Sequence, residues 1–383
     1  MNKNWEMKKL GEVIKLEYGK PLPDSKRKSD GAYPVYGANG EKDRTDEYYY
    51  DKQSIIVGRK GSAGEINLTE NKFWPLDVTY FVTFDSKKYD LYFVYYLLSK
   101  LELQKLAKGV KPGINRNEVY SINVQIPQLP EQKHIVSILD ETFAAIDKAK
   151  ENAEKNLQNS RELFESYLKS VFANPEDEWE EIKLEDAFDI KHGFAFKSEF
   201  FSDKGDYVLL TPGNFFEEGG YRDRGEKQKY YTGEIPKGYV LKKDDLLIAM
   251  TEQAPGLLGS PIIIPESDMF LHNQRLGLIV HKENYKIDTK FLFYLFNTQR
   301  MRSLIHKSAS GVKVRHTSPK KVLEITASIP KSLSEQQSIV AKLDALSAET
   351  KRLEEIYLKK LAALDELKKS VLQKAFNGEL AGA

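Results

Sequence analysis

Two short stretches that each follow a predicted strand carry side chains able to read the edges of base pairs. The stretches supply Arg59, Lys60, Ser62, Thr251, Glu252 and Gln253. Arginine or lysine can donate to guanine O6 and N7, glutamine can bind adenine N6 and N7, and glutamate can accept from cytosine N4. Because the two stretches have different side chains, they predict contacts with different DNA sequences.

Downstream of each stretch lies a segment without acidic residues, at 103–117 and 289–323. Basic side chains in such segments can neutralise phosphates and fix the register of a protein on DNA. The candidates for phosphate contact are Lys108, Lys111, Asn115, Arg116, Lys313, Arg315, His316 and Lys320. Their recurrence in both halves of the chain favours phosphate contact over a merely solvated basic loop.

Two further loops add candidates for base contact, although residues of these types more often occupy turns or plain surface. They supply Tyr36, Asn39, Lys42, Asn214, Tyr221, Arg222 and Arg224.

No constellation of catalytic residues is apparent. The six histidines are not spaced as metal ligands, and the sequence has no cysteine. The glycine-rich residues 58–64 lack the Gly-Lys-Ser/Thr ending of a phosphate-binding loop. A methyltransferase acting on exocyclic amines would carry an Asn-Pro-Pro-aromatic motif, and the nearest match is Asn174-Pro175-Glu176 at a helix end. We therefore predict no catalytic residue, no metal site and no cofactor in this chain.

The candidate residues lie in segments of mixed α and β pattern. Alternating or apolar runs predict strands at 54–57, 78–84, 246–250 and 276–280. Asp90 and Asp288 are predicted to cap amphipathic helices at 91–107 and 290–307.

A long helical segment follows each mixed segment. Residues 130–174 recur without a gap at an offset of 204 residues, and apolar side chains in both copies step by three and four. Helices of about 40 residues at ~1.5 Å per residue would be on the order of 60 Å long. We predict an antiparallel coiled coil that holds two other regions apart, rather than ordinary bundle helices.

The repeat extends beyond the helices. Residues 5–20 match residues 179–194 at an offset of 174, and the second copy has some thirty extra residues in its middle. Matching ends with divergent middles indicate one scaffold used twice to present two different surfaces.

Composition limits the remaining choices. The 383 residues are 40% hydrophobic, enough for two or three domains with real cores. A net charge of +1 argues weakly against DNA binding, but the basic residues are segregated into the segments described above. The sequence has no signal-peptide core and no apolar run of the roughly 18 residues that cross a membrane. We expect a soluble, cytoplasmic protein without a membrane partner.

Residues 109–140 and 310–344 resemble the junction of a target-recognition domain with the conserved helix of a type I restriction-modification specificity (S) subunit. The resemblance covers essentially the whole chain. It implies an α+β fold with two mixed α/β target-recognition domains, joined by two long antiparallel coiled-coil helices with an internal pseudo-twofold repeat. The predicted boundaries are 1–129 for the first domain, 130–174 for its helix, 175–333 for the second domain and 334–383 for its helix.

The family implies a non-catalytic subunit that reads a bipartite, asymmetric site in double-stranded DNA. Two methyltransferase (M) subunits carrying S-adenosylmethionine would dock on the helices, and restriction (R) subunits using ATP and Mg would join them. Three alternatives are a specificity subunit of another bipartite restriction system, a coiled-coil adaptor that binds proteins only, and a fused endonuclease-methyltransferase. The missing catalytic motifs disfavour the last. In the second copy, Val314-Arg315-His316 replace Pro112-Gly113-Ile114, a departure from the family's loop pattern.

Overall fold

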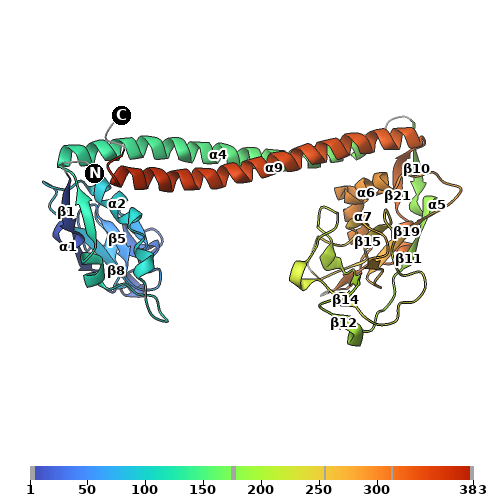
Figure 1. Cartoon of the computed structure of the whole chain (residues 1–383), viewed down its shortest axis with the longest axis horizontal. Helices are drawn as coiled ribbons and strands as arrows, with labels where there is room; N and C mark the ends of the chain where they lie inside the picture. Colours follow the sequence, from blue (N-terminus) through green and yellow to red (C-terminus); the bar gives the residue numbers. More distant parts are fainter. Residues whose placement is uncertain (1–4, 174–177, 254–255, 312–313, 380–383) are drawn as a thin grey trace. The chain divides into compact units, whose positions relative to one another are not determined.

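The computed structural model describes residues 5–173, 178–253, 256–311 and 314–379. The chain divides into two compact units. The first unit comprises Met1–Lys155 and Tyr357–Ala383, and the second comprises Asn156–Ile356. Each unit therefore contains one mixed segment and one end of each long helix (Figure 1). The four-segment division remains a prediction, since the units cut across the helices.

Two of the sheets in the first unit are antiparallel throughout. β1 (Glu6–Lys9) pairs with β9 (Asn123–Ile126), and a four-stranded sheet has the order β2-β8-β5-β6. Its strands are β2 (Lys15–Tyr18), β5 (Ile55–Gly58), β6 (Ile66–Leu68) and β8 (Thr79–Thr83). Strands β5 and β8 confirm the two predicted in this half of the chain.

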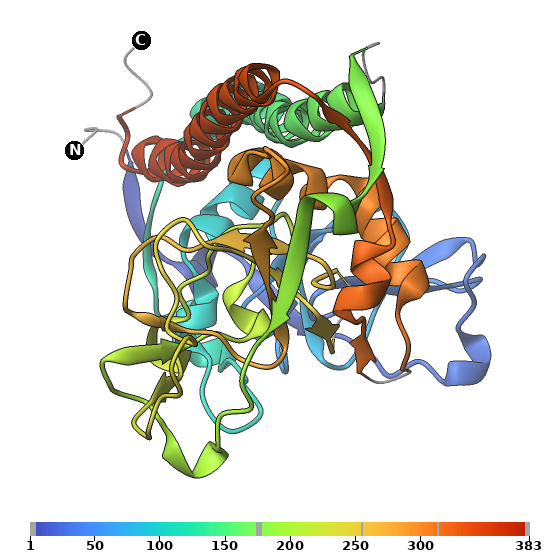
Figure 2. The ribbon, with the colours of Figure 1, turned by 90° about the vertical axis from the view of Figure 1, so that its right-hand side faces the viewer.

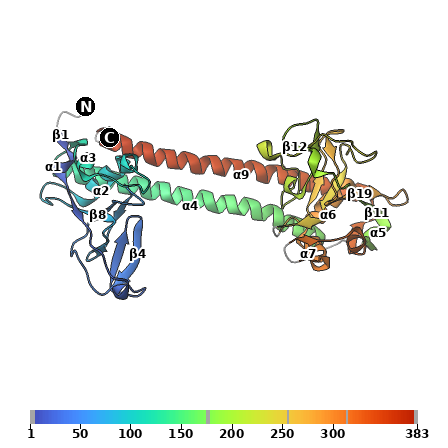
Figure 3. The same cartoon turned by 90° about the horizontal axis from the view of Figure 1, so that it is seen from below.

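A smaller sheet of order β4-β3-β7 completes the first unit. It consists of β3 (Tyr33–Gly37), β4 (Gly40–Thr45) and β7 (Trp74–Pro75). Figure 3 shows β4 on the side of this unit away from the long helices.

The helices of the first unit are α1 (Leu10–Val13), α2 (Leu91–Lys100) and α3 (Arg116–Tyr120). Asp90 caps α2 as predicted, because its side chain accepts from the backbone N–H groups of Tyr92 and Phe93. Helix α2 ends at Lys100, short of the predicted 107, since Glu102 takes a left-handed conformation with φ of 47° and starts a separate 3-10 turn.

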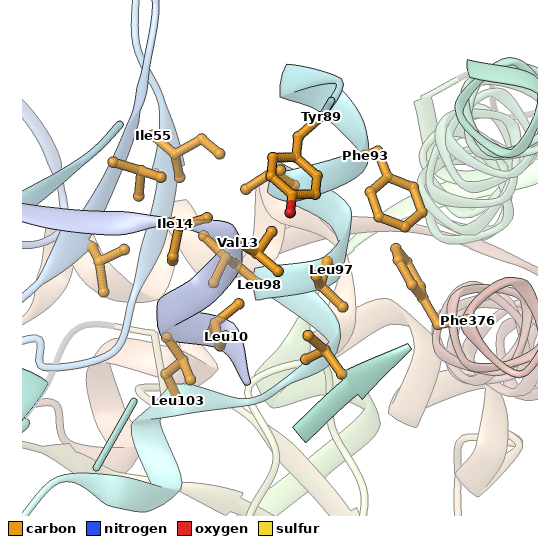
Figure 4. Packing of buried hydrophobic residues seen from close by; sticks show 14 of the residues in the cluster. Leu10, Val13, Ile14, Ile55, Tyr89, Phe93, Leu97, Leu98, Leu103 and Phe376 are labelled. Atoms are coloured by element: carbon orange, nitrogen blue, oxygen red, sulfur yellow. The ribbon is translucent and has the colours of Figure 1, made fainter. Parts of the chain in front are cut away.

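The core of the first unit packs both long helices against α2. Phe93 of α2 lies 5.1 Å from the ring of Phe376, at the end of the second long helix (Figure 4). Both side chains are buried, and Leu10, Val13 and Leu97 belong to the same cluster.

The second unit repeats this plan. β10 (Trp179–Lys183) pairs with β21 (Thr326–Pro330), and a sheet of order β11-β19-β15-β17 corresponds to the main sheet of the first unit. Its strands are β11 (Phe188–His192), β15 (Leu246–Ala249), β17 (Pro261–Ile263) and β19 (Leu276–His281). Strands β15 and β19 confirm the predictions for this half.

The extra residues of the second copy build an additional strand. The smaller sheet has the order β12-β14-β13-β18, four strands where the first unit has three. Its strands are β12 (Phe201–Ser202), β13 (Tyr207–Leu209), β14 (Tyr230–Tyr231) and β18 (Phe270–Leu271).

The helix predicted at 290–307 is two helices. α6 (Thr289–Asn297) is followed by Thr298, whose extended backbone breaks the helix. The Thr298 side chain caps α7 (Gln299–Ser308) by accepting from Met301 N. Asp288 caps α6 as predicted. Short helices α5 (Leu184–Ala187) and α8 (Pro319–Leu323) complete the unit. In Figure 2, α6 lies directly beneath the long helices, between them and the strands of this unit.

The two long helices, α4 (Leu129–Ala173) and α9 (Leu333–Phe376), pack antiparallel within each unit. In the first unit Lys368 pairs with Asp147 at 2.8 Å and Lys150 with Asp365 at 2.7 Å; in the second, Arg161 pairs with Glu354 at 3.0 Å. Partner numbers on α9 fall as those on α4 rise, which confirms the antiparallel pairing.

A glycine marks the end of α9. Gly378 lies two residues after Phe376, the last residue of α9, and has a φ of 75°, the left-handed conformation that commonly ends a helix. The predicted stop of α4 at Asn174 and Pro175 lies outside the described residues.

Candidate nucleic-acid interface

In the first unit, the loop after β5 lies directly against the basic loop that precedes α3. Gly61 N donates to Pro112 O at 2.9 Å, and Ile114 N donates to Arg59 O at 3.1 Å. An isolated antiparallel bridge joins Lys60 to Gly113. The structure thus brings the candidates for base contact beside the candidates for phosphate contact, although about fifty residues separate them in sequence.

Two arginines from these loops share one tyrosine ring. The guanidinium carbons of Arg59 and Arg116 lie 5.4 and 5.2 Å from the ring centroid of Tyr18, which is 49% exposed. Arg59 also donates from Nε to Asp77 O at 3.0 Å. Cation–π contact and this hydrogen bond orient both guanidinium groups without neutralising them, as a phosphate or guanine contact requires.

The tyrosine ring is itself supported from within the sheet. Tyr80 on β8 lies 5.1 Å from Tyr18, ring centroid to ring centroid. Burial, with a further contribution from the Tyr18 hydroxyl, raises the pKa of Tyr80 to about 12. Tyr80 is therefore neutral at physiological pH and adds no charge that would repel a phosphate.

A hollow of about 470 Å³ opens beside the loop after β5. Asn39, Lys42, Lys60 and Ser62 line it, and Leu76 and Val78 add apolar surface. The side chains of Lys42 and Lys60 are exposed and have no acidic partner among the described residues, whereas neighbouring Arg27 lies 3.8 Å from Asp43. The hollow therefore combines two unpaired positive charges with polar groups suited to a nucleotide.

The other candidates of the first unit divide into surface and structural residues. Lys111 is exposed, and Lys108 is exposed but paired with Glu118 at 2.7 Å. Asn115 caps α3 by accepting from Asn117 N at 2.8 Å. Tyr36 is 6% exposed and accepts from Glu70 N at 3.2 Å, so its side chain belongs to the core rather than to the exposed surface.

The second unit brings the equivalent loops together as a strand pair. β16 (Thr251–Glu252) pairs antiparallel with β20 (Arg315–His316), with Thr251 opposite His316. Gln253 follows β16 and is exposed. Lys313 lies outside the described residues.

Glu252 supports its loop from inside. Its carboxylate is buried and accepts from Gly256 N at 3.1 Å and from Leu258 N at 2.9 Å. The Glu252 carboxylate is thus engaged by backbone amides in the protein interior, and its contact with cytosine stays a prediction.

Helix α7 holds the same loop from the other side. Arg302 donates from Nη2 to Gly256 O, and His306 Nε2 lies 3.5 Å from Glu252 Oε1. Burial lowers the pKa of Arg302 to about 10, so the guanidinium stays charged at neutral pH. A half-buried guanidinium and a buried carboxylate on either side of the loop fix the backbone that presents Gln253.

The remaining candidates of the second unit also divide into surface and structural residues. Arg222 is exposed and lies 5.9 Å from the ring of Phe216, which is 40% exposed; Lys320 is exposed on α8. His316 is exposed, with Nε2 3.1 Å from Ser310 Oγ, and Arg315 donates to His306 O at 2.9 Å.

Asn214 is a structural residue. It is 1% exposed, accepts from Thr211 N at 3.0 Å and donates to Gln228 Oε1 at 3.1 Å. Its amide organises the turn that carries Arg222 and has no free group directed outward.

The sequence gives only weak signals for Tyr18 and Arg302. Tyr18 directly precedes Gly19, one of the glycines repeated between the two copies, and this position could have directed attention to it. Arg302 lies in an acid-free segment with several other basic residues, and nothing in the sequence distinguishes it from the exposed ones.

Neither a cluster of metal ligands nor a membrane-spanning helix occurs in the part of the chain that the structure describes. In residues 5–173, 178–253, 256–311 and 314–379, no group of three His, Asp or Glu side chains could hold a metal ion. No helix within those ranges is long and apolar enough to span a bilayer.

Comparison with known proteins agrees with this architecture. A family model described as the type I restriction modification DNA specificity domain matches residues 2–156 and 176–361. The MjaVIII type I restriction enzyme specificity subunit of Methanocaldococcus jannaschii is 25% identical, and the match covers 98% of this chain and 93% of that protein.

Solved structures share the fold. A chain from a study titled for the complex assembly and conformational transition of the type I R-M system aligns with a TM-score of 0.75, at 18% identity over 99% of both chains. The HsdS subunit of Thermoanaerobacter tengcongensis aligns with a TM-score of 0.64, at 17% identity over 99% of this chain and 98% of that one. Because the family model matches two segments that together make up most of the sequence, this chain belongs to the type I restriction-modification DNA specificity family.

Proposed function

We propose that this protein is the non-catalytic sequence-recognition subunit of a type I restriction-modification complex, in which each unit reads one half of a bipartite, asymmetric site in double-stranded DNA. The observation that carries the proposal is the loop pair found in both units. Each pair sets a loop that follows a central strand against a basic loop, and the two pairs carry different side chains.

The proposed contacts divide by chemistry. In the first unit Arg59, Arg116 and Lys111 bind phosphates or guanine edges, and Asn39, Lys60 and Ser62 take part through the hollow. In the second unit Gln253 and Thr251 read base edges, while Arg222, His316 and Lys320 lie on the exposed surface for backbone contact.

The long helices are proposed to set the gap between half-sites and to receive two methyltransferase (M) subunits. Exposed apolar side chains on these helices support a docking role: Leu358 is 51% and Leu367 47% exposed in the first unit, and Leu163 is 51% exposed in the second. Restriction (R) subunits would join the M subunits.

We propose that all cofactors belong to the partners, with S-adenosylmethionine in the M subunits and ATP with Mg in the R subunits. The chain alone, incubated with DNA and labelled S-adenosylmethionine, should transfer no methyl group, whereas the complex with its M subunits should. Transfer by the chain alone would contradict the non-catalytic assignment. A cytoplasmic location, where chromosomal DNA is accessible, completes the proposal.

The experiment that tests the helical ruler inserts one heptad into residues 148–159 of α4, with a matched heptad in the facing part of α9. Seven residues add about 10 Å to a helix, which corresponds to about three base pairs at roughly 3.4 Å each. The complex should then methylate the same two half-sites across a gap about three base pairs longer. An unchanged gap would count against the ruler, and changed half-sites would count against separate reading units.

A further inference from the structure

Each long helix has, in its first turn, a glutamine whose side chain is completely buried. Gln132 lies in the first turn of α4 and Gln336 in the first turn of α9, and both are 0% exposed. A neutral amide has two N–H donors and an acceptor oxygen, and burying it costs free energy unless these groups find partners.

Both glutamines satisfy their amides with backbone groups of the adjoining domain. Gln132 Oε1 accepts from Asp90 N at 2.9 Å, and its Nε2 donates to Lys88 O at 3.0 Å and to Pro127 O at 2.9 Å. A single side chain thus joins three segments: the start of α4, the N-terminus of α2 and the end of β9.

The second unit repeats the three contacts. Gln336 Oε1 accepts from Asp288 N at 2.8 Å, and its Nε2 donates to Pro330 O at 2.9 Å and to Lys286 O at 3.4 Å. The aspartate in each case is the residue whose own side chain caps the domain helix. The glutamine therefore positions the capping aspartate, and the aspartate stabilises the start of the domain helix.

Two exposed or half-buried contacts flank each glutamine at the same junction. Trp5 Nε1 donates to Glu131 at 2.8 Å, and Trp179 Nε1 donates to Glu335 at 2.7 Å. The Tyr96 hydroxyl donates to Asp140, and that of Tyr294 to Asp344, each at 2.5 Å. These contacts lie on either side of the glutamine along the helix and resist tilting of the domain on it.

We propose that Gln132 and Gln336 are positioning residues that lock each recognition domain on its long helix, so that the gap between half-sites is read to a single base pair. The proposal rests on the proposed function. A domain free to tilt on its helix would still read its own bases but would accept half-sites at neighbouring spacings. A glutamine that only filled the core would affect all spacings alike.

The test uses the complex with M subunits and DNA substrates in which the gap is the preferred length or one base pair shorter or longer. Gln132→Glu keeps the acceptor for Asp90 N but places a carboxylate oxygen against the carbonyls of Lys88 and Pro127. The ratio of methylation rates between the preferred gap and the neighbouring gaps should fall by about tenfold, with the same half-site bases required. Gln336→Glu should act in the same way at the other domain.

The matched controls make the same chemical change on exposed side chains. Gln128 lies four residues before Gln132, and Gln337 directly follows Gln336; both are exposed. Gln128→Glu and Gln337→Glu should leave the ratio unchanged. If Gln132→Glu does not fold, Gln132→Met, which keeps the volume and removes all three hydrogen bonds, provides the same comparison.

Folded variants at Gln132 and Gln336 that keep the wild-type ratio between gaps would overturn the proposal. So would variants that lower methylation equally at every gap. If the wild-type complex required no two-part site, the proposed function itself would fail. If the wild-type complex requires a bipartite site but the substitutions leave its gap preference unchanged, only the role of the glutamines fails.

Discussion

In the first unit the loop after β5 presents Arg59 beside Tyr18 and lines a hollow. In the second unit, by contrast, Glu252 and Arg302 bind backbone groups of the loop after β15, which presents Gln253. The junctions with the long helices show the opposite relation. Tryptophan, glutamine and tyrosine make the same contacts in both units, with distances that agree within a few tenths of an ångström. Side chains at the junction repeat, and side chains in the loops differ.

This contrast locates recognition and spacing in different parts of each unit. A loop can change its side chains without moving the backbone pairing that holds it, because the pairing uses backbone groups. The buried glutamines of the junction have no such freedom, because their own side chains make the contacts. Three predictions probe the comparison, starting with the largest expected effect.

The helix ends should differ in how much they stabilise their units. Phe376 is 4% exposed against Phe93, while Phe172, its counterpart in the repeat, is only partly buried against Phe291. Phe376→Ala should lower the unfolding free energy of the first unit by about 4 kcal/mol, and Phe172→Ala should cost the second unit roughly half as much. Hydrogen exchange resolved by unit measures both.

Leu358→Ala serves as the control, because this α9 side chain is 51% exposed and its loss should cost little. Equal costs for the two phenylalanines would show that the helix ends contribute alike. A Phe376→Ala cost no larger than that of the control would contradict the packing of α9 into the first core.

Mild acid should destabilise the second unit selectively. Five of the six histidines lie in it, and the first unit has only the exposed His134. Burial lowers the pKa of His272 to about 4, with smaller contributions from Lys191 and His192. The unfolded chain, with a histidine pKa of about 6.5, therefore binds more protons between pH 6.5 and 4, and the unfolding free energy falls as the pH falls.

At pH 5 the second unit should have lost about 2 kcal/mol relative to pH 7, and His272→Asn should flatten that dependence. Hydrogen exchange of the first unit, measured in the same experiment, provides the internal reference. A parallel loss of protection in both units between pH 7 and 5 would exclude His272 as the cause.

The smallest effect concerns phosphate contact. Arg59→Gln with Arg116→Gln should weaken binding of the M-subunit complex to DNA by about tenfold and reduce the salt slope by about two contacts. Arg315→Gln should reduce it by at most one, because Arg315 already donates to His306 O. Lys87→Gln, at an exposed lysine in a turn beside the helix junction, is the control. Equal slopes for all variants would remove these arginines from the interface.

Local signals in the sequence were sufficient for the helices and their starts. Asp90 and Asp288 cap helices as predicted, and the long helices begin within one residue of the predicted positions, because capping and heptad spacing depend on near neighbours in the chain. The break at Thr298 was missed because an apolar pattern continues through it.

The candidate interface could be predicted only in part, because burial depends on residues far away in sequence. Tyr36 lies on β3 and Asn214 ends a 3-10 turn, and residues from other segments cover both side chains. The sharing of Tyr18 by Arg59 and Arg116 joins three segments that no sequence spacing connects. The basic loops recur in both copies of the sequence, and in each unit the basic loop lies beside the loop that follows a central strand.

The central claim is that each unit reads its own half of the site, and mapping methylated adenines across a host genome tests it most directly. The chain would be co-expressed with its M subunits in three forms: unaltered, with alanine at Arg59, Lys60 and Ser62, and with alanine at Thr251 and Gln253. We expect a split, asymmetric motif with a fixed gap, in which the first variant relaxes one half and the second variant relaxes only the other. A continuous motif, or one half-site altered by both variants, would contradict separate reading by the two units.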